Sequence, residues 1–166
     1  MQEIILRYCL KDSRHDAQSE DQRAPWLLSI IDLCDSPETY HDKIIEALST
    51  EQDCWSLSQL FDLCLLLAKR GNIGAEKAIF NRFDKQNFEE SWQGASEIFD
   101  LKGLDGLAHV AKTIGQRMIN DPNAWDGGAY YEACEIFGKE QVKQYLLKLS
   151  QNTPAIATYL QSVLDH

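Results

Sequence analysis

The sequence predicts an all-α protein in which about eight or nine helices stack as antiparallel hairpins, in the manner of an α-solenoid. Apolar residues recur at spacings of three and four along most of the chain. Gly71, Gly103 and Gly138 follow such segments, where a glycine commonly ends a helix. Three tryptophans open successive helix pairs at similar intervals. We therefore expect a single helical-repeat domain over residues 1–166.

The most informative stretch runs from Trp55 to Phe83. Residues 57–68 are apolar nearly all round a predicted helix, so this helix is expected in the middle of the packed structure. Gly71 offers the left-handed residue that often follows a helix. A second helix is expected over about residues 73–84. Its single apolar face is formed by Ala75, Ala78, Ile79 and Phe83.

The N-terminal third is less regular. Residues 2–10 fit a short helix or a strand, because periodicity does not decide for so short a run. Residues 11–23 contain only one apolar residue and predict a mobile polar loop, either a plain solvated linker or a functional segment. A helix follows over about residues 25–34, with Pro25 in its first turn and with Leu27, Ile30, Ile31 and Cys34 facing inward. Ser36 and Pro37 begin the next helix, whose inner face is Tyr40, Ile44, Ala47 and Leu48.

The C-terminal half continues the same alternation of apolar stripes and breaks. Residues 104–118 carry the clearest stripe, which lasts four turns, and the sequence Asn120-Asp121-Pro122-Asn123 interrupts it. Thr153 and Pro154 are expected to open the last helix. The helices expected in this half lie near residues 92–102, 104–118, 125–137, 142–149 and 154–164.

The tryptophans indicate an internal repeat. Trp55, Trp92 and Trp125 are 37 and 33 residues apart, and each opens a helix that ends at a glycine. Such a period is typical of stacked helical hairpins. Residues 24–164 therefore resemble HEAT-like or armadillo-like α-helical repeats, although the Asp/Arg signature of a HEAT hairpin is absent. The resemblance implies a right-handed stack that binds other proteins along a concave face; a non-repetitive helical bundle is the alternative.

The net charge of −10 is concentrated near the N-terminus. Residues 1–54 contain 12 acidic and 5 basic residues, against 14 and 11 in residues 55–166. Nucleic acid is not expected as a partner, because phosphate binding needs clustered Lys and Arg. A basic protein would be attracted by this field, although the charge also serves solubility alone.

Cysteine and histidine usage indicates neither a metal nor a cofactor. The five cysteines form no CxxC pair, and no histidine lies at zinc-ligand spacing from them. Their odd number favours reduced thiols and a cytoplasmic protein. No apolar run is long enough to span a membrane, and the start of the chain lacks the basic region of a signal peptide. The histidines, which fit structural roles, are His15, His41, His109 and His166.

No catalytic constellation emerges from the remaining motifs. Glu132 and Glu135 share a helical face, but any acidic helix supplies such a pair. Gly127 and Gly128 lack the Lys-Ser/Thr of a phosphate loop and permit close approach of a helix or a ligand. Aromatic residues surround this glycine pair. Either they fill the core, or they are contacts for a partner, together with an acidic neighbour and the tryptophan of the preceding hairpin. The candidate partner-binding residues are Trp125, Asp126, Tyr130, Tyr131 and Trp92.

Taken together, these patterns favour a protein–protein interaction module that binds a basic protein, either as a scaffold or as an immunity-type inhibitor of a basic toxin. The alternative is an enzyme or small-ligand carrier with a polar pocket between helices. Such a pocket would hold convergent polar groups and a desolvated carboxylate or histidine. An oligomerisation module is a third interpretation.

Overall fold

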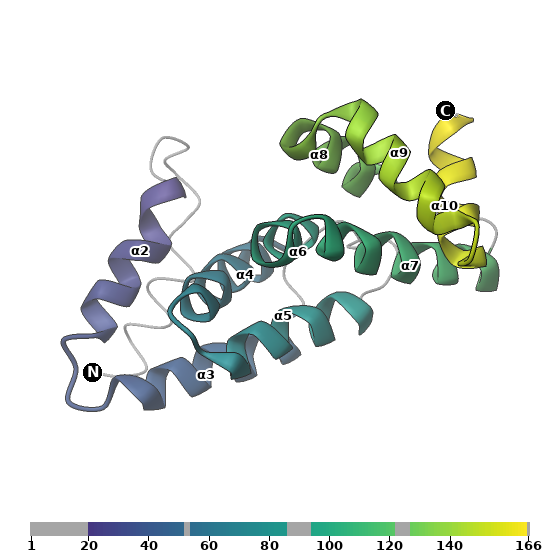
Figure 1. The fold of residues 1–166 in the computed structure, drawn as a ribbon. Coiled ribbons are helices and arrows are strands. Elements are labelled where there is room, and N and C mark those ends of the chain that lie inside the picture. The colour runs from purple at the N-terminus through teal and green to yellow at the C-terminus, as the bar shows by residue number, and fades with distance from the viewer. Residues whose placement is uncertain (1–19, 52–53, 86–93, 122–126, 166) are drawn as a thin grey trace. The chain divides into compact units, whose positions relative to one another are not determined.

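The chain folds into helices throughout the residues that the structure, a computed structural model, describes, namely 20–51, 54–85, 94–121 and 127–165 (Figure 1). These ranges contain nine helices and no strand, which confirms the predicted all-α class. The helices are α2 (Glu20–Ile31), α3 (Pro37–Thr50), α4 (Cys54–Lys69), α5 (Ile73–Lys85), α6 (Ala95–Lys102), α7 (Leu104–Asn120), α8 (Gly128–Phe137), α9 (Lys139–Ser150) and α10 (Pro154–Leu164).

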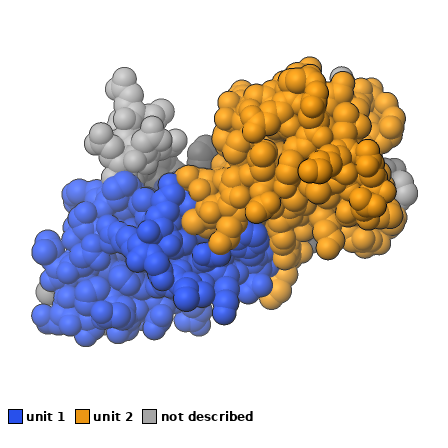
Figure 2. Space-filling view, in the orientation of Figure 1, with its two compact units in different colours: residues 1–81 blue, residues 82–166 orange. Residues whose placement is uncertain are grey.

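The helices gather into two compact units, one over residues 1–81 and one over residues 82–166 (Figure 2). Each unit has its own set of buried apolar side chains. The expectation of a single repeat domain over residues 1–166 stays a prediction, as does the resemblance to HEAT-like repeats.

Helix α4 is the centre of the first unit. It packs against both α2 and α3, so its apolar side chains are covered from more than one direction. This is the position that the sequence predicted for a helix that is apolar nearly all round. The fully or almost fully buried residues of α4 are Leu57, Leu60, Phe61, Leu63, Cys64 and Leu67.

The turn between α4 and α5 has the predicted glycine geometry. Gly71 has a φ of 92°, in the left-handed region that favours glycine. Its N–H donates to Ala68 O at 2.9 Å, and the N–H of Asn72 donates to Leu67 O at 3.0 Å, which is a Schellman motif. The Asn72 side chain then accepts the N–H of Ala75 at 3.0 Å and caps the start of α5. Figure 1 shows α5 running back beneath α4.

Two N-terminal predictions need correction. The helix predicted from Pro25 begins five residues earlier, so residues 20–23 of the predicted polar loop are helical; residues 11–19 lie outside the described part. Pro25 consequently lies inside α2, where it removes one backbone hydrogen bond. The helix also ends at Ile31, three residues earlier than predicted.

Helix α7 is central to the second unit. It packs against α6, α9 and, most extensively, α10. The predicted stripe is largely confirmed, since Leu107, Ala111, Ile114 and Met118 are buried. Two glycines on α7 allow neighbouring backbone to approach closely: an added Cβ at Gly106 would lie 2.5 Å from Ile98 O, and one at Gly115 would overlap the carbonyl of Ala155 on α10.

In the second unit, one apolar residue of the predicted helix near residues 125–137 lies on the surface. Ile136, one of the apolar residues that define the helix predicted near residues 125–137, is 52% exposed. Helix α8 buries Ala129, Tyr130 and Ala133 instead. Ile136 lies seven residues after Ala129 and therefore on nearly the same face, so its exposure shows that the last turn of this face is left uncovered.

Candidate binding surface

Helix α2 presents apolar side chains on the side away from its buried face. Leu27, Leu28 and Ile31 are buried, whereas Trp26 is 63% exposed. Because successive helical residues turn by about 100°, Trp26 and Ile30 lie together on the opposite side. Leu33, two residues past the end of α2, is 87% exposed. We call Trp26, Ile30 and Leu33 the α2 stripe; exposed tryptophan is enriched among the residues that contribute most at protein interfaces.

The surroundings of the α2 stripe are strongly acidic. Residues 24–51 contain six acidic residues and one basic residue, Lys43. Asp35, Glu38 and Asp42 are exposed on the turn after α2 and on α3. This part of the chain therefore presents negative charge next to apolar surface, which is a combination that attracts basic amphipathic partners.

The turn between α2 and α3 is held to the rest of its unit by ionic contacts. Arg70, which follows α4, donates to Asp32 Oδ2 at 2.8 Å. The Nε2 atom of His41 on α3 lies 3.8 Å from the other oxygen of Asp32 and is buried without a hydrogen bond among the described residues. Asp32 thus connects the turn after α2 to the end of α4 through Arg70, and it lies near His41 of α3.

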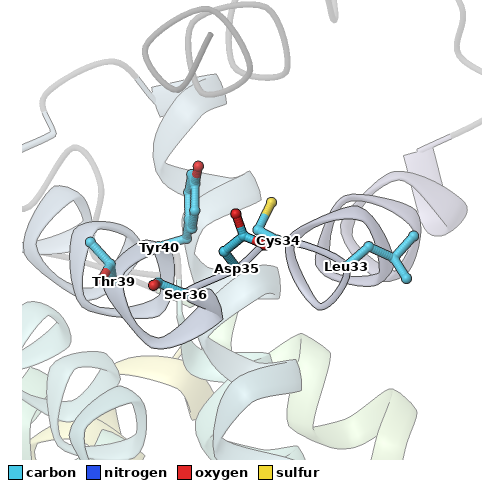
Figure 3. A pocket seen from close by; sticks show the side chains of 6 residues that line it. All are labelled: Leu33, Cys34, Asp35, Ser36, Thr39 and Tyr40. Atoms are coloured by element: carbon cyan, nitrogen blue, oxygen red, sulfur yellow. The ribbon is translucent and has the colours of Figure 1, made fainter.

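A surface hollow of about 360 Å³ opens at this turn, directly after Leu33 (Figure 3). Its volume is at the lower end of the range of roughly 300–1,000 Å³ that is common for small-molecule sites. Figure 3 shows Cys34, Asp35 and Tyr40 pointing to the same side of the turn. The hollow is lined by Leu33, Cys34, Asp35, Ser36, Thr39 and Tyr40.

The structure describes two of the five residues that the sequence proposed as partner contacts. Tyr130 is 2% exposed, and burial raises its pKa to about 12. Tyr131 is 55% exposed, with its ring centroid 6.0 Å from that of Tyr130. A partner would therefore reach Tyr131, while Tyr130 serves the core. Trp92, Trp125 and Asp126 lie outside the described residues.

Sequence reasoning did not propose Trp26 or Leu33 as contacts. The sequence nevertheless indicated that both residues are exposed, because neither belongs to the inner face that the apolar spacing predicts for this helix. That assignment placed Ile30 inside, whereas Ile30 is only half-buried. A tryptophan left outside the apolar face of a short helix is the pattern that could have identified this surface.

The carboxylate pair proposed at Glu132 and Glu135 is only partly shielded from solvent. Glu132 is half-buried, whereas Glu135 is exposed. Desolvation raises the pKa of Glu132, a hydrogen bond with Ser96 lowers it in part, and the charge of Glu135 raises it further. Ser96 on α6 also donates to Glu97 Oε2 at 3.2 Å. The hollow at the α2–α3 turn belongs to the other unit, so it is not a pocket for this pair.

The raised pKa of Glu132 predicts how stability depends on pH. An acid whose pKa is higher in the folded state costs stability once it ionises, so the cost is absent below its unfolded value near 4.5 and grows as pH rises through the folded value. Glu132→Gln should therefore raise the unfolding midpoint in urea at pH 7 and leave it nearly unchanged at pH 4. Glu135→Gln at an exposed position is the control. A lower midpoint for Glu132→Gln at pH 7 would show that the carboxylate stabilises the fold.

His109 has a structural partner in the second unit. Its Nε2 atom lies 2.9 Å from Asp84 Oδ1, which also accepts the Thr113 hydroxyl at 3.1 Å. Arg117 donates to Phe83 O, and its guanidinium lies 5.3 Å from the centroid of the Phe83 ring. These contacts attach the end of α5 to α7, which agrees with the structural role expected for this histidine.

The described cysteines, Cys34, Cys64 and Cys134, are free thiols. Burial raises the pKa of Cys64 to about 12, so this thiol is a core side chain rather than a nucleophile. In the described ranges, no three His, Cys, Asp or Glu side chains are placed to hold a metal ion. None of the described helices has the length and apolar character that crossing a membrane requires.

Comparison of the chain with protein-family models, with curated proteins and with solved structures gives no match. The most distinctive feature of the chain's surface is the α2 stripe with its acidic neighbours and the adjoining hollow.

Proposed function

We propose that this chain is a protein-interaction module, and that a basic segment of a partner protein docks on the α2 stripe. The observation that carries the proposal is the exposure of Trp26 and Leu33, at 63% and 87%, within a stretch that has six acidic residues and one basic residue. Tryptophan is among the residues that contribute most to binding energy at protein interfaces.

The charge favours a basic partner over a neutral or acidic one. Negative charge on Asp35, Glu38 and Asp42 accelerates the approach of a positively charged protein and disfavours an acidic competitor. Such steering weakens as salt rises, because exposed charges are screened beyond about 10 Å at 0.1 M ionic strength. A scaffold and an inhibitor of a basic protein would both use a surface of this kind, and a HEAT-like arrangement and a cytoplasmic location accord with either role.

Trp26→Ala should reduce capture of the partner about tenfold or more, because truncating a central aromatic contact commonly costs more than about 1.4 kcal/mol. The full chain, this variant and a control would each be immobilised and exposed to cell extract at low salt, and every recovered protein quantified. Ile73→Ala is the matched control, because Ile73 is a similarly exposed apolar residue, at 66%, on a different helix of the same unit.

Support requires a basic protein whose recovery falls with Trp26→Ala, persists with Ile73→Ala and declines at 0.5 M salt. Recovery that is equal for all three chains would overturn the proposal. Tyr131→Ala, tested in parallel, addresses the exposed aromatic of the second unit. Loss of capture only in Tyr131→Ala would move the binding surface to α8.

The enzyme or ligand-carrier alternative depends on Glu132, whose desolvated carboxylate is a feature of many active sites. Only one member of the carboxylate pair is shielded, and its half-burial does not create the water-excluded site that acid–base catalysis uses. The α2 stripe therefore supports binding more directly than Glu132 supports catalysis.

A further inference from the structure

We propose that the hollow at the α2–α3 turn receives an arginine side chain of the basic partner. This inference rests on the proposed function, because the hollow begins at Leu33, where the α2 stripe ends. A partner that covers Trp26 and Leu33 can therefore extend one side chain into the hollow. The inference adds a specific recognition site to the general attraction between opposite charges.

The lining has the chemistry that a guanidinium group needs. Asp35 supplies a carboxylate, and Ser36 and Thr39 also line the hollow. Arginine carries several N–H donors in a planar fork and pairs with carboxylates in two parallel hydrogen bonds. The Cys34 side chain and the apolar atoms of Leu33 provide surface for the methylene stem.

Tyr40 also lines the hollow, although it is only 6% exposed, and it lies near one cation of the chain itself. The Nζ atom of Lys43 is 6.0 Å from the centroid of the Tyr40 ring. Aromatic faces attract cations at this distance, and arginine in particular stacks on them. Lys43 also opposes a second positive charge, so its removal should tighten binding in the hollow. Tighter binding after removal of Lys43 is expected for a cation in the hollow and is not expected for a simple apolar contact.

The direct test titrates the full chain, labelled with 15N, with N-acetyl-arginine methylamide and follows the backbone amides by NMR. N-acetyl-citrulline methylamide is the control ligand, because it has nearly the same shape without the charge. We expect shifts confined mainly to residues 33–40 with the arginine compound and much smaller ones with citrulline. Asp35→Asn should raise the Kd about threefold to fivefold, because an exposed ion pair contributes up to about 1 kcal/mol.

Two further variants test whether arginine binding depends on the hollow itself. Asp42→Asn removes an exposed acid of α3 that does not line the hollow, and it should leave the Kd within about twofold, since exposed pairs contribute little. Lys43→Gln should lower the Kd. Equal binding of citrulline and arginine, or an unchanged Kd in Asp35→Asn, would overturn the inference.

The outcomes for the two proposals are separable. Capture that depends on Trp26, without Asp35-dependent arginine binding, overturns the arginine site and keeps the interaction surface. Asp35-dependent arginine binding, with capture that ignores Trp26, overturns the docking proposal and leaves a cation-binding hollow of another purpose.

Discussion

Replacing Gly115 by alanine is expected to destabilise residues 82–166 by about 3 kcal/mol or more, the upper end of the cost of overpacking. The added Cβ would overlap the backbone carbonyl of Ala155, at the start of α10. No rotamer change relieves this clash, because the obstacle is backbone. Helices α7 and α10 would have to separate, and their contact is the most extensive between helices of the second unit.

The measurement is urea unfolding combined with hydrogen exchange resolved along the chain. Exchange should accelerate in α7 and α10, while the helices of the first unit keep their protection. Gly74→Ala is the matched control, since it makes the same change in a helix where the nearest atoms, at 3.1 and 3.5 Å, are the ends of the Asn72 and Ile45 side chains. Protection in α7 and α10 equal to that of the unchanged protein would show that the two backbones are farther apart than described.

The importance of Gly115 illustrates what the sequence could not predict. Apolar spacing placed Ile114 and Met118 on the buried stripe of α7 correctly, because burial of a stripe depends only on helical geometry. Which helix covers that stripe is a matter of tertiary packing. From the sequence alone, Gly115 is only a residue of low helix propensity. Its role in close packing becomes clear once Ala155 on α10 is known to lie against it.

Turns and helix starts were predicted correctly where one or two residues determine the backbone conformation. Gly71 adopts the left-handed conformation, and Pro37 is the first residue of α3. Helix starts without an apolar residue were predicted poorly, as at Glu20. The candidate site shows the same limit. Tyr130 and Tyr131 are the same residue type and adjacent in the sequence, but the turn of the helix between them buries Tyr130 and exposes Tyr131.

Phe61→Ala is expected to lower the free energy of unfolding of the first unit by about 3–5 kcal/mol, the usual cost of deleting a buried phenylalanine. Phe61 is 0% exposed on α4, the helix against which α2 and α3 both pack. Truncation removes contacts in a region covered from several directions, and the unit cannot collapse around the void without moving at least one of those helices. Because α2 carries the stripe, loosened packing should also weaken capture of the partner.

Leu66→Ala on the same helix is the control, because Leu66 is only half-buried and its truncation opens a smaller void. Urea unfolding should show a clearly smaller loss for Leu66→Ala, and exchange in Phe61→Ala should accelerate in α2, α3 and α4. Equal losses for the two variants would contradict the central position of α4. Faster exchange in Phe61→Ala without weaker capture would show that the packing of α2 on α4 does not hold the binding stripe in place, and would leave Asp32 with its contacts to Arg70 and His41 as the anchor.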